Sequence, residues 1–326
     1  MSPVQPGAAA LDSPVTGLTS RAWWPWARRA LTLAFFGLIG WLLVDHARTV
    51  DWPGVAAAVW RKPVGVLATA LALAAASHAL YSCFDLLGRQ YTRHKLPTLT
   101  VMGITFASYA FNLNLGSLIG GVGFRFRLYS RFGLKGGTIT RVLGISLLTN
   151  WLGYLLLAGL VFAVVPPALP AAWQVPEAAL RGLGAVLIGL AAGYVGLASL
   201  WPGRTWSWRG QALPLPGARM AWLQLAMSCA NWLLVATLIW VLLERQVPFT
   251  AVLAVYLLAA IAGVVTYVPA GLGVLEAVFI ALLGAQVGET RLLAALMAYR
   301  AIYYLVPLAL AAILYPWLEA RTRRRP

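Results

Sequence analysis

Long apolar runs recur along the whole 326-residue chain, and they constrain its fold more than any other feature. A helix of about 20 apolar residues is long enough to span the hydrocarbon core of a bilayer. Only 10% of the residues are charged, whereas a soluble domain needs many more to cover its surface. No long polar stretch separates the runs. The sequence therefore predicts an all-α, polytopic integral membrane protein.

Six of the apolar runs are candidates for full membrane spans. Five have ample length, and the shortest is flanked by tryptophans, which favour the membrane interface. In chain order, the six candidates are residues 30–44, 64–87, 142–165, 182–200, 220–243 and 292–314.

Two further apolar regions, residues 96–124 and 247–285, are each interrupted by a glycine-rich segment. Glycine permits unusual dihedral angles, and proline interrupts the helical hydrogen-bond ladder. Non-helical backbone at membrane depth needs shelter from protein or a wet cavity. Each region is thus a kinked span or a re-entrant hairpin, and asparagines can cap the broken helix ends. The predicted turn residues are Asn112, Asn114, Gly121, Gly123, Pro269, Gly271 and Gly273.

The distribution of basic residues decides between these alternatives. Basic clusters at residues 89–95 and 125–141 flank the first broken region, and the positive-inside rule places both in the cytoplasm. That region must then return to its own side. The resulting prediction is six full spans and two re-entrant hairpins with both termini cytoplasmic, which puts 18 of the 25 Lys and Arg residues inside. The net charge of +16 is explained by topology and anionic lipid, so no nucleic-acid partner is expected.

A weak internal repeat supports this arrangement. A shift of 150 residues places Gly121 and Gly123 on Gly271 and Gly273, and each half reads span, span, hairpin, span. Three crossings per half make the second half inverted, which is a recurring plan of secondary transporters. The predicted segments are a disordered cytoplasmic tail (1–20), membrane repeat 1 (21–177), membrane repeat 2 (178–320) and a basic cytoplasmic tail (321–326).

Two ionisable residues lie deep within the second half. Glu276 follows the proline-glycine break, and Arg300 lies within the last span. Such groups are costly at membrane depth, so we expect their side chains to face the interior and to pair. One interpretation is a structural salt bridge. The other is that Arg300 binds a lipid phosphate while Glu276 meets a cationic headgroup or gates the site.

Other polar residues allow similar alternatives. Arg125 and Arg127 alternate with aromatic residues and either anchor the interface or reach lipid phosphates. Asp85 can pair with Arg89 one helical turn later. Within the spans, the polar residues Ser77, His78 and Asn231 are expected to make interhelical hydrogen bonds.

The sequence lacks the usual signatures of catalysis. It has no Walker motif and no G-x-S-x-G elbow. Cys83 and Cys229 lie inside apolar runs, the three histidines are scattered, and no metal-ligand spacing is present. We therefore expect no enzymatic activity, no metal and no cofactor.

Two segments carry a resemblance to a known family. Gly116–Lys135 and Val268–Glu276 are similar to the two signatures of the lysylphosphatidylglycerol synthase transmembrane region, the flippase part of the multiple peptide resistance factor. The second signature usually reads P-G-G-x-G-x-x-E, and this chain has Ala270 at the middle position. The resemblance covers roughly residues 28–318 and implies a location in the bacterial inner membrane. Because no aminoacyl-transferase domain follows, aminoacyl transfer is not expected.

The resemblance implies binding or movement of phospholipids, classically aminoacylated phosphatidylglycerol. We expect a translocase whose hairpins form a polar cavity for the headgroup, with Arg125, Arg127, Glu276 and Arg300 as lipid-binding residues. The alternative is a non-transporting subunit that presents lipid to a separate glycosyl- or aminoacyl-transferase. An intramembrane enzyme acting on lipid phosphate is a third class. Membrane phospholipids are thus the expected partners, with a separate lipid-modifying enzyme as the other candidate.

Overall fold

The computed structural model describes residues 52–170, 174–208, 211–265 and 273–323. The chain divides into two compact units, residues 1–50 and 51–326, and only the second contains described residues. The predicted span at residues 30–44, the tail at 1–20 and the turn residues Pro269 and Gly271 lie outside the described residues.

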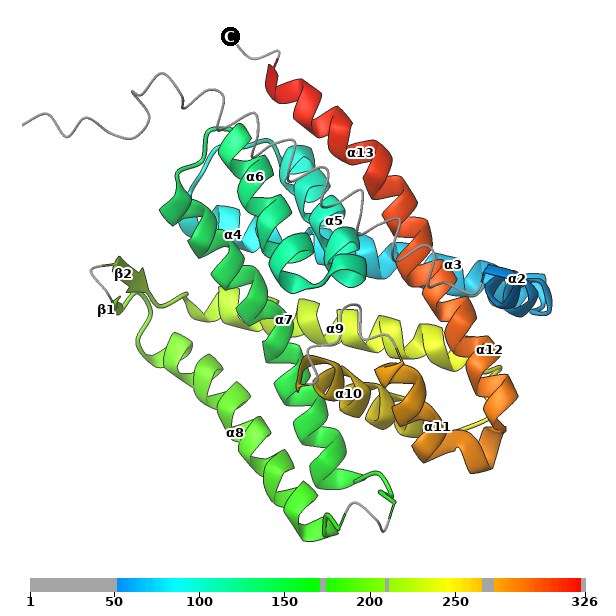
Figure 1. The fold of residues 1–326 in the computed structure, drawn as a ribbon. Coiled ribbons are helices and arrows are strands. Elements are labelled where there is room, and N and C mark those ends of the chain that lie inside the picture. The colour runs from blue at the N-terminus through cyan, green and yellow to red at the C-terminus, as the bar shows by residue number, and fades with distance from the viewer. Residues whose placement is uncertain (1–51, 171–173, 209–210, 266–272, 324–326) are drawn as a thin grey trace, which may run out of the picture. The chain divides into compact units, whose positions relative to one another are not determined.

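The second unit is built almost entirely of helices (Figure 1). In chain order the elements are α2 (Trp52–Trp60), α3 (Val64–Ser82), α4 (Phe84–Thr92), α5 (Thr98–Leu115), η2 (Ser117–Gly123), α6 (Phe124–Arg131), α7 (Gly136–Val164), α8 (Glu177–Leu200), β1 (Thr205–Trp208), β2 (Gln211–Pro214), α9 (Ala218–Leu242), α10 (Phe249–Val265), α11 (Val274–Val287), α12 (Glu289–Arg300), η5 (Ala301–Leu305) and α13 (Val306–Arg323).

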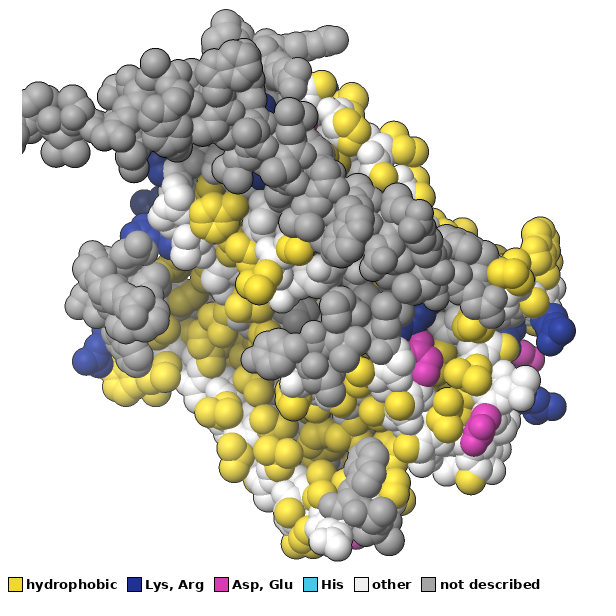
Figure 2. Space-filling view, in the orientation of Figure 1, with side chains coloured by type: hydrophobic (Ala, Val, Ile, Leu, Met, Phe, Trp, Pro, Cys, Tyr) yellow, Lys and Arg dark blue, Asp and Glu magenta, His cyan; other side chains and the backbone are white. Residues whose placement is uncertain are grey.

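Five helical segments among the described residues are long and apolar enough to cross a membrane. They coincide with five of the predicted spans, which confirms a polytopic helical membrane protein. Large apolar side chains on them are exposed, and Figure 2 shows hydrophobic side chains spread across the visible face. Such a surface suits lipid rather than water. The five segments are Val64–Thr92, Gly136–Val164, Glu177–Leu200, Ala218–Leu242 and Glu289–Thr322.

Two features at the edges of these helices were not predicted. The antiparallel strands β1 and β2 form a short hairpin between α8 and α9, with Thr205 opposite Pro214. Helix α13 continues to Arg323, so the predicted tail at 321–326 begins as helix.

The first broken region folds as a helical hairpin. Phe111 of α5 stacks on Phe124 at the start of α6, with ring centroids 4.2 Å apart. Farther from the turn, Thr105 of α5 interacts with the Tyr129 hydroxyl of α6. Residues earlier in α5 thus meet residues later in α6, and the chain reverses direction, as predicted.

The turn of this hairpin lies at Gly116 rather than at the predicted Gly121 and Gly123. Gly116 has a φ of +84°, a conformation that side chains rarely tolerate, whereas the other two glycines lie inside the π-helical segment η2. The neighbouring Gly120 permits the close contact between the two arms, because a Cβ there would lie 2.3 Å from the Phe111 carbonyl.

Replacing Gly120 with alanine is therefore expected to destabilise the hairpin by about 1–3 kcal/mol, the usual cost of overpacking. The matched control is Gly137→Ala, because a Cβ at Gly137 meets nothing within 4 Å. The stability of both variants is measured as the midpoint of thermal unfolding of the purified protein in detergent. Equal midpoints for Gly120→Ala and the control would contradict the tight contact.

The second broken region also contains two short apolar helices. Helices α10 and α11 pack against each other, with residues 266–273 between them (Figure 1). Gly273 caps the start of α11 in the left-handed region, with a φ of +78°. Helices α10 and α11 are thus a second pair of short helices that follow one another in the chain and pack together, like α5 and α6.

The last long helix contains a π-helical break at residues 301–305, two residues before Pro307. Proline has no N–H, so the Tyr303 carbonyl cannot receive the usual bond from residue 307. The His78 side chain contacts this carbonyl instead, with Nε2 at 3.1 Å from the oxygen. The break thereby presents backbone oxygens to neighbouring helices, and π-bulges of this kind are frequent at functional sites.

Candidate functional site

Glu276 and Arg300 form the ion pair that the sequence predicts. Arg300 Nη2 donates to Glu276 Oε2 at 3.0 Å, and Arg300 Nε donates to the other carboxylate oxygen. The guanidinium also lies over the Tyr304 ring, 5.5 Å from its centroid. Both charged side chains are about one-sixth exposed (16% and 17%), so the pair is shielded yet can be reached from outside.

A polar and aromatic network lies one turn farther along the same helix. The Tyr303 hydroxyl is 2.8 Å from Ser77 Oγ and 3.1 Å from the Tyr109 hydroxyl. Ser77 Oγ in turn donates to Asn231 Oδ1 at 2.8 Å, and the His78 ring packs 4.7 Å from the Tyr303 ring. The predicted interhelical hydrogen bonding of Ser77, His78 and Asn231 is therefore confirmed. Tyr109 and Tyr303 complete the network and were not predicted.

Both hairpins meet the segment that contains Arg300 and η5. The first hairpin contributes Asn114, whose Nδ2 donates to the Tyr304 carbonyl at 3.3 Å, and Tyr109, which bonds Tyr303. The second contributes Glu276, which pairs with Arg300. Asn114 thus bonds the backbone of the last helix at its π-helical break, rather than only capping its own hairpin. The Asn112 carbonyl accepts the Gly116 N–H at 3.0 Å, so its backbone closes the turn.

A second buried ion pair joins α4 to α6, and it corrects a prediction. Asp85 Oδ2 lies 3.4 Å from Arg125 Nε and accepts a hydrogen bond from the Tyr129 hydroxyl at 2.9 Å. The Asp85 side chain is completely buried, so its predicted surface pair with Arg89 is wrong. Arg89 instead donates to Thr98 Oγ1 at 2.7 Å.

Arg127 lies in a third ionic cluster, between α6 and α13. Its Nη2 donates to Glu319 Oε1 at 2.9 Å, and Arg131 contacts the same oxygen at 3.1 Å. Arg125 and Arg127 are therefore held by different acidic partners. Arg125 is buried, while Arg127 and Arg131 expose about 16% and 31% of their side chains. Two cations on one carboxylate leave this cluster with a net positive charge.

The described residues contain no group of three or more His, Cys, Asp or Glu side chains close enough to hold a metal ion. The arrangement is that of paired charges and aromatic hydroxyls at the junction of two helical hairpins.

The family of the chain follows from its sequence matches. A family model described as the lysylphosphatidylglycerol synthase TM region matches residues 29–311. The chain belongs to this family. The match spans both hairpins, the Glu276–Arg300 pair and the Asp85–Arg125 pair, and it ends before Glu319.

Individual relatives agree with this assignment. Inner membrane protein YbhN of Escherichia coli (strain K12) is 43% identical over 302 residues, which cover 92% of this chain and 95% of that protein. Protein slr0712 of Synechocystis sp. is 29% identical over 262 residues, with coverages of 79% and 81%. Phosphatidylglycerol lysyltransferase of Staphylococcus haemolyticus is 35% identical over 91 residues, only 27% of this chain and 11% of that protein. The chain is thus a multi-pass membrane protein with an inner-membrane relative.

Proposed function

We propose that this chain is a phospholipid translocase of the bacterial inner membrane, and that its substrate is an anionic or aminoacylated phosphatidylglycerol-type lipid. The observation that carries the proposal is the convergence of both helical hairpins on the helix that contains Arg300. Broken helices that meet near the middle of the membrane form the substrate sites of many secondary transporters. The family match and the lysyltransferase relative support a phospholipid as the substrate.

In the proposed mechanism, a lipid phosphate replaces Glu276 as the partner of Arg300. A guanidinium presents a planar fork of donors that suits a phosphate as well as a carboxylate. The released Glu276 carboxylate then attracts the ammonium group of an aminoacylated headgroup. The exchange keeps Arg300 paired throughout, which avoids an isolated charge in apolar surroundings.

Arg125 and Arg127 receive different roles in this proposal. Arg125 is buried against Asp85, so its part is to hold the first hairpin in place rather than to meet lipid from outside. Arg127 and Arg131 around Glu319 are partly exposed and positively charged in sum, which suits a headgroup that enters or leaves the site.

The proposed architecture is an inverted repeat of six full spans and two re-entrant hairpins. Helices α5 and α6 correspond to α10 and α11, and α7 corresponds to the long final helix. The predicted orientation places both termini and the exposed residues Lys135 and Gly136 in the cytoplasm, with the exposed Gln246 on the other side.

Single-cysteine labelling tests this orientation, after Cys83 and Cys229 are replaced. We expect Gly136→Cys to react with a membrane-impermeant reagent only after the cells are opened, and Gln246→Cys to react in intact spheroplasts. Labelling of Gly136→Cys from the periplasmic side would rule out the re-entrant arrangement of the first hairpin.

The alternative function is a non-transporting subunit that presents lipid to a separate glycosyl- or aminoacyl-transferase. Purified protein reconstituted into liposomes with labelled phosphatidylglycerol separates the possibilities. Movement of the label between leaflets supports a translocase. Binding without movement supports the presenting subunit, and chemical change of the label indicates an enzyme.

A further inference from the structure

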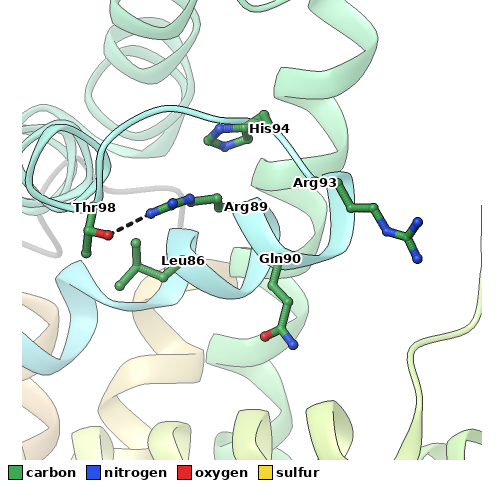
Figure 3. Close-up of a pocket in the computed structure, with 6 residues that line it drawn as sticks. All are labelled: Leu86, Arg89, Gln90, Arg93, His94 and Thr98. Carbon is green, nitrogen blue, oxygen red and sulfur yellow. Dashed lines mark hydrogen bonds between the residues drawn. The ribbon is translucent and has the colours of Figure 1, made fainter.

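A second cationic site lies away from Arg300, where α4 ends and α5 begins (Figure 3). It is a pocket of about 350 Å³ that contains two arginines and a histidine but no acidic side chain. The residues that line it are Leu86, Arg89, Gln90, Arg93, His94 and Thr98.

No acidic side chain lines this pocket among the described residues. The acidic residue closest in sequence is Asp85, one helical turn before Arg89, and it is buried against Arg125 and Tyr129. Arg93 is exposed at the end of α4, in a left-handed conformation with a φ of 54°. A cavity lined by two arginines and, among the described residues, by no carboxylate favours an anionic ligand.

Arg89 is oriented for such a ligand. Its Nη1 donates to Thr98 Oγ1 at 2.7 Å, which holds the guanidinium across the pocket (Figure 3). A guanidinium has five N–H donors, so this one bond leaves others for an anion. Thr98 is also the first residue of the 18-residue helix α5, and no side chain caps the start of this helix. The dipole of α5 therefore adds to the positive potential in the pocket.

His94 also lines the pocket, and its Nε2 is buried with no hydrogen-bond partner among the described residues. Its Nδ1 accepts the Leu96 N–H at 3.4 Å, so a neutral ring carries its proton on Nε2. Burial, followed by the nearby Arg89 cation, lowers the pKa of His94, and the ring is therefore neutral at pH 7. An anion in the pocket would offset the effect of the Arg89 charge on the pKa of His94.

We propose that this pocket binds a phosphate group, carried either by the headgroup of an anionic phospholipid or by a small soluble phosphate compound. Arginines with bidentate geometry and a helix N-terminus together form a typical phosphate environment. The volume of the pocket suits a headgroup without its acyl chains. The site is separate from the Arg300 site and does not depend on translocation.

Two titrations of the purified protein test the proposal. In the first, glycerol 3-phosphate is titrated into the protein and its binding is measured by calorimetry. In the second, the protein is titrated with nanodiscs of phosphatidylglycerol or of phosphatidylcholine. We expect saturable binding of at least one phosphate probe, with affinity at least ~10-fold lower in the double variant Arg89→Gln/Arg93→Gln. Arg93→Gln alone should show a smaller loss, and it removes only an exposed charge. Binding of glycerol 3-phosphate points to a soluble ligand, and selective binding to phosphatidylglycerol points to a lipid headgroup.

A control variant separates this pocket from general charge effects. Lys135→Gln removes an exposed positive charge outside the pocket and should bind like the wild type. The proposal is overturned if the folded double variant binds both probes as tightly as the wild type, or if the wild type binds neither.

Discussion

Replacing Arg300 with lysine is expected to leave the chain folded and to slow phospholipid translocation by about tenfold or more, a barrier increase of about 1.4 kcal/mol. Lysine keeps the positive charge that Glu276 requires, so the interior pair survives. It loses the planar fork, which presents two parallel donors to a phosphate. The measurements are folded yield in detergent and translocation of labelled phosphatidylglycerol in proteoliposomes.

The matched control is Arg181→Lys, since Arg181 also pairs with a glutamate, Glu177, but on an exposed helix surface. It should fold and translocate like the wild type. Wild-type rates from well-folded Arg300→Lys would count against a guanidinium-specific phosphate contact. If well-folded Arg300→Ala also translocated normally, Arg300 would have no part in the site.

Replacing Asp85 with asparagine is expected to destabilise the folded chain by about 3–5 kcal/mol, the usual cost of leaving a buried charge unpaired. The Asp85 side chain is fully buried and that of Arg125 is 7% exposed, so water cannot replace the lost carboxylate. The expected readouts are a lower midpoint of thermal unfolding in detergent and a lower yield of folded protein.

A double variant distinguishes the ion pair from other effects of the substitution. Replacing a buried pair by neutral side chains is often harmless, so Asp85→Asn/Arg125→Met should be more stable than Asp85→Asn alone. Glu177→Gln breaks an exposed pair and should change stability by at most about 1 kcal/mol. A double variant no more stable than the single one would show that the unpaired Arg125 charge is not the cause of the loss.

The sequence predicts well those features that depend on a single run or on the cost of one isolated charge. Five spans follow from the length of their apolar runs. The pair between Glu276 and Arg300 follows because either residue alone is costly in apolar surroundings. The chain reversal in the first broken region follows from loop charge. None of these features depends on how the helices pack against one another.

Features that depend on packing between distant segments were missed. Asp85 seemed to pair with Arg89 because residues four apart on a helix are neighbours. The fold instead turns its carboxylate towards Arg125, which lies on another helix and offers a buried partner. In the same way, sequence alone does not place Glu319 beside Arg127, since the two are far apart in the chain.

The exact positions of turns and helix breaks were also harder to predict than the positions of the apolar spans. Several glycines stand close together in the first broken region, and the sequence does not show that Gly116 takes the positive φ or that Gly120 packs against Phe111. Pro307 was a visible signal for the break in the last helix. Its consequence, a Tyr303 carbonyl contacted by His78, depends on a helix more than 200 residues away.

The most direct test of the central claim is the rate at which labelled phosphatidylglycerol changes leaflet in vesicles that contain only this purified chain. The label is placed in the inner leaflet, and its arrival at the outer surface is followed with an impermeant quencher as the number of proteins per vesicle increases. The account predicts that the rate rises with protein density and falls towards the protein-free value for Arg300→Lys. A rate equal to that of protein-free vesicles at every wild-type density, although the protein is folded and binds the lipid, would contradict it.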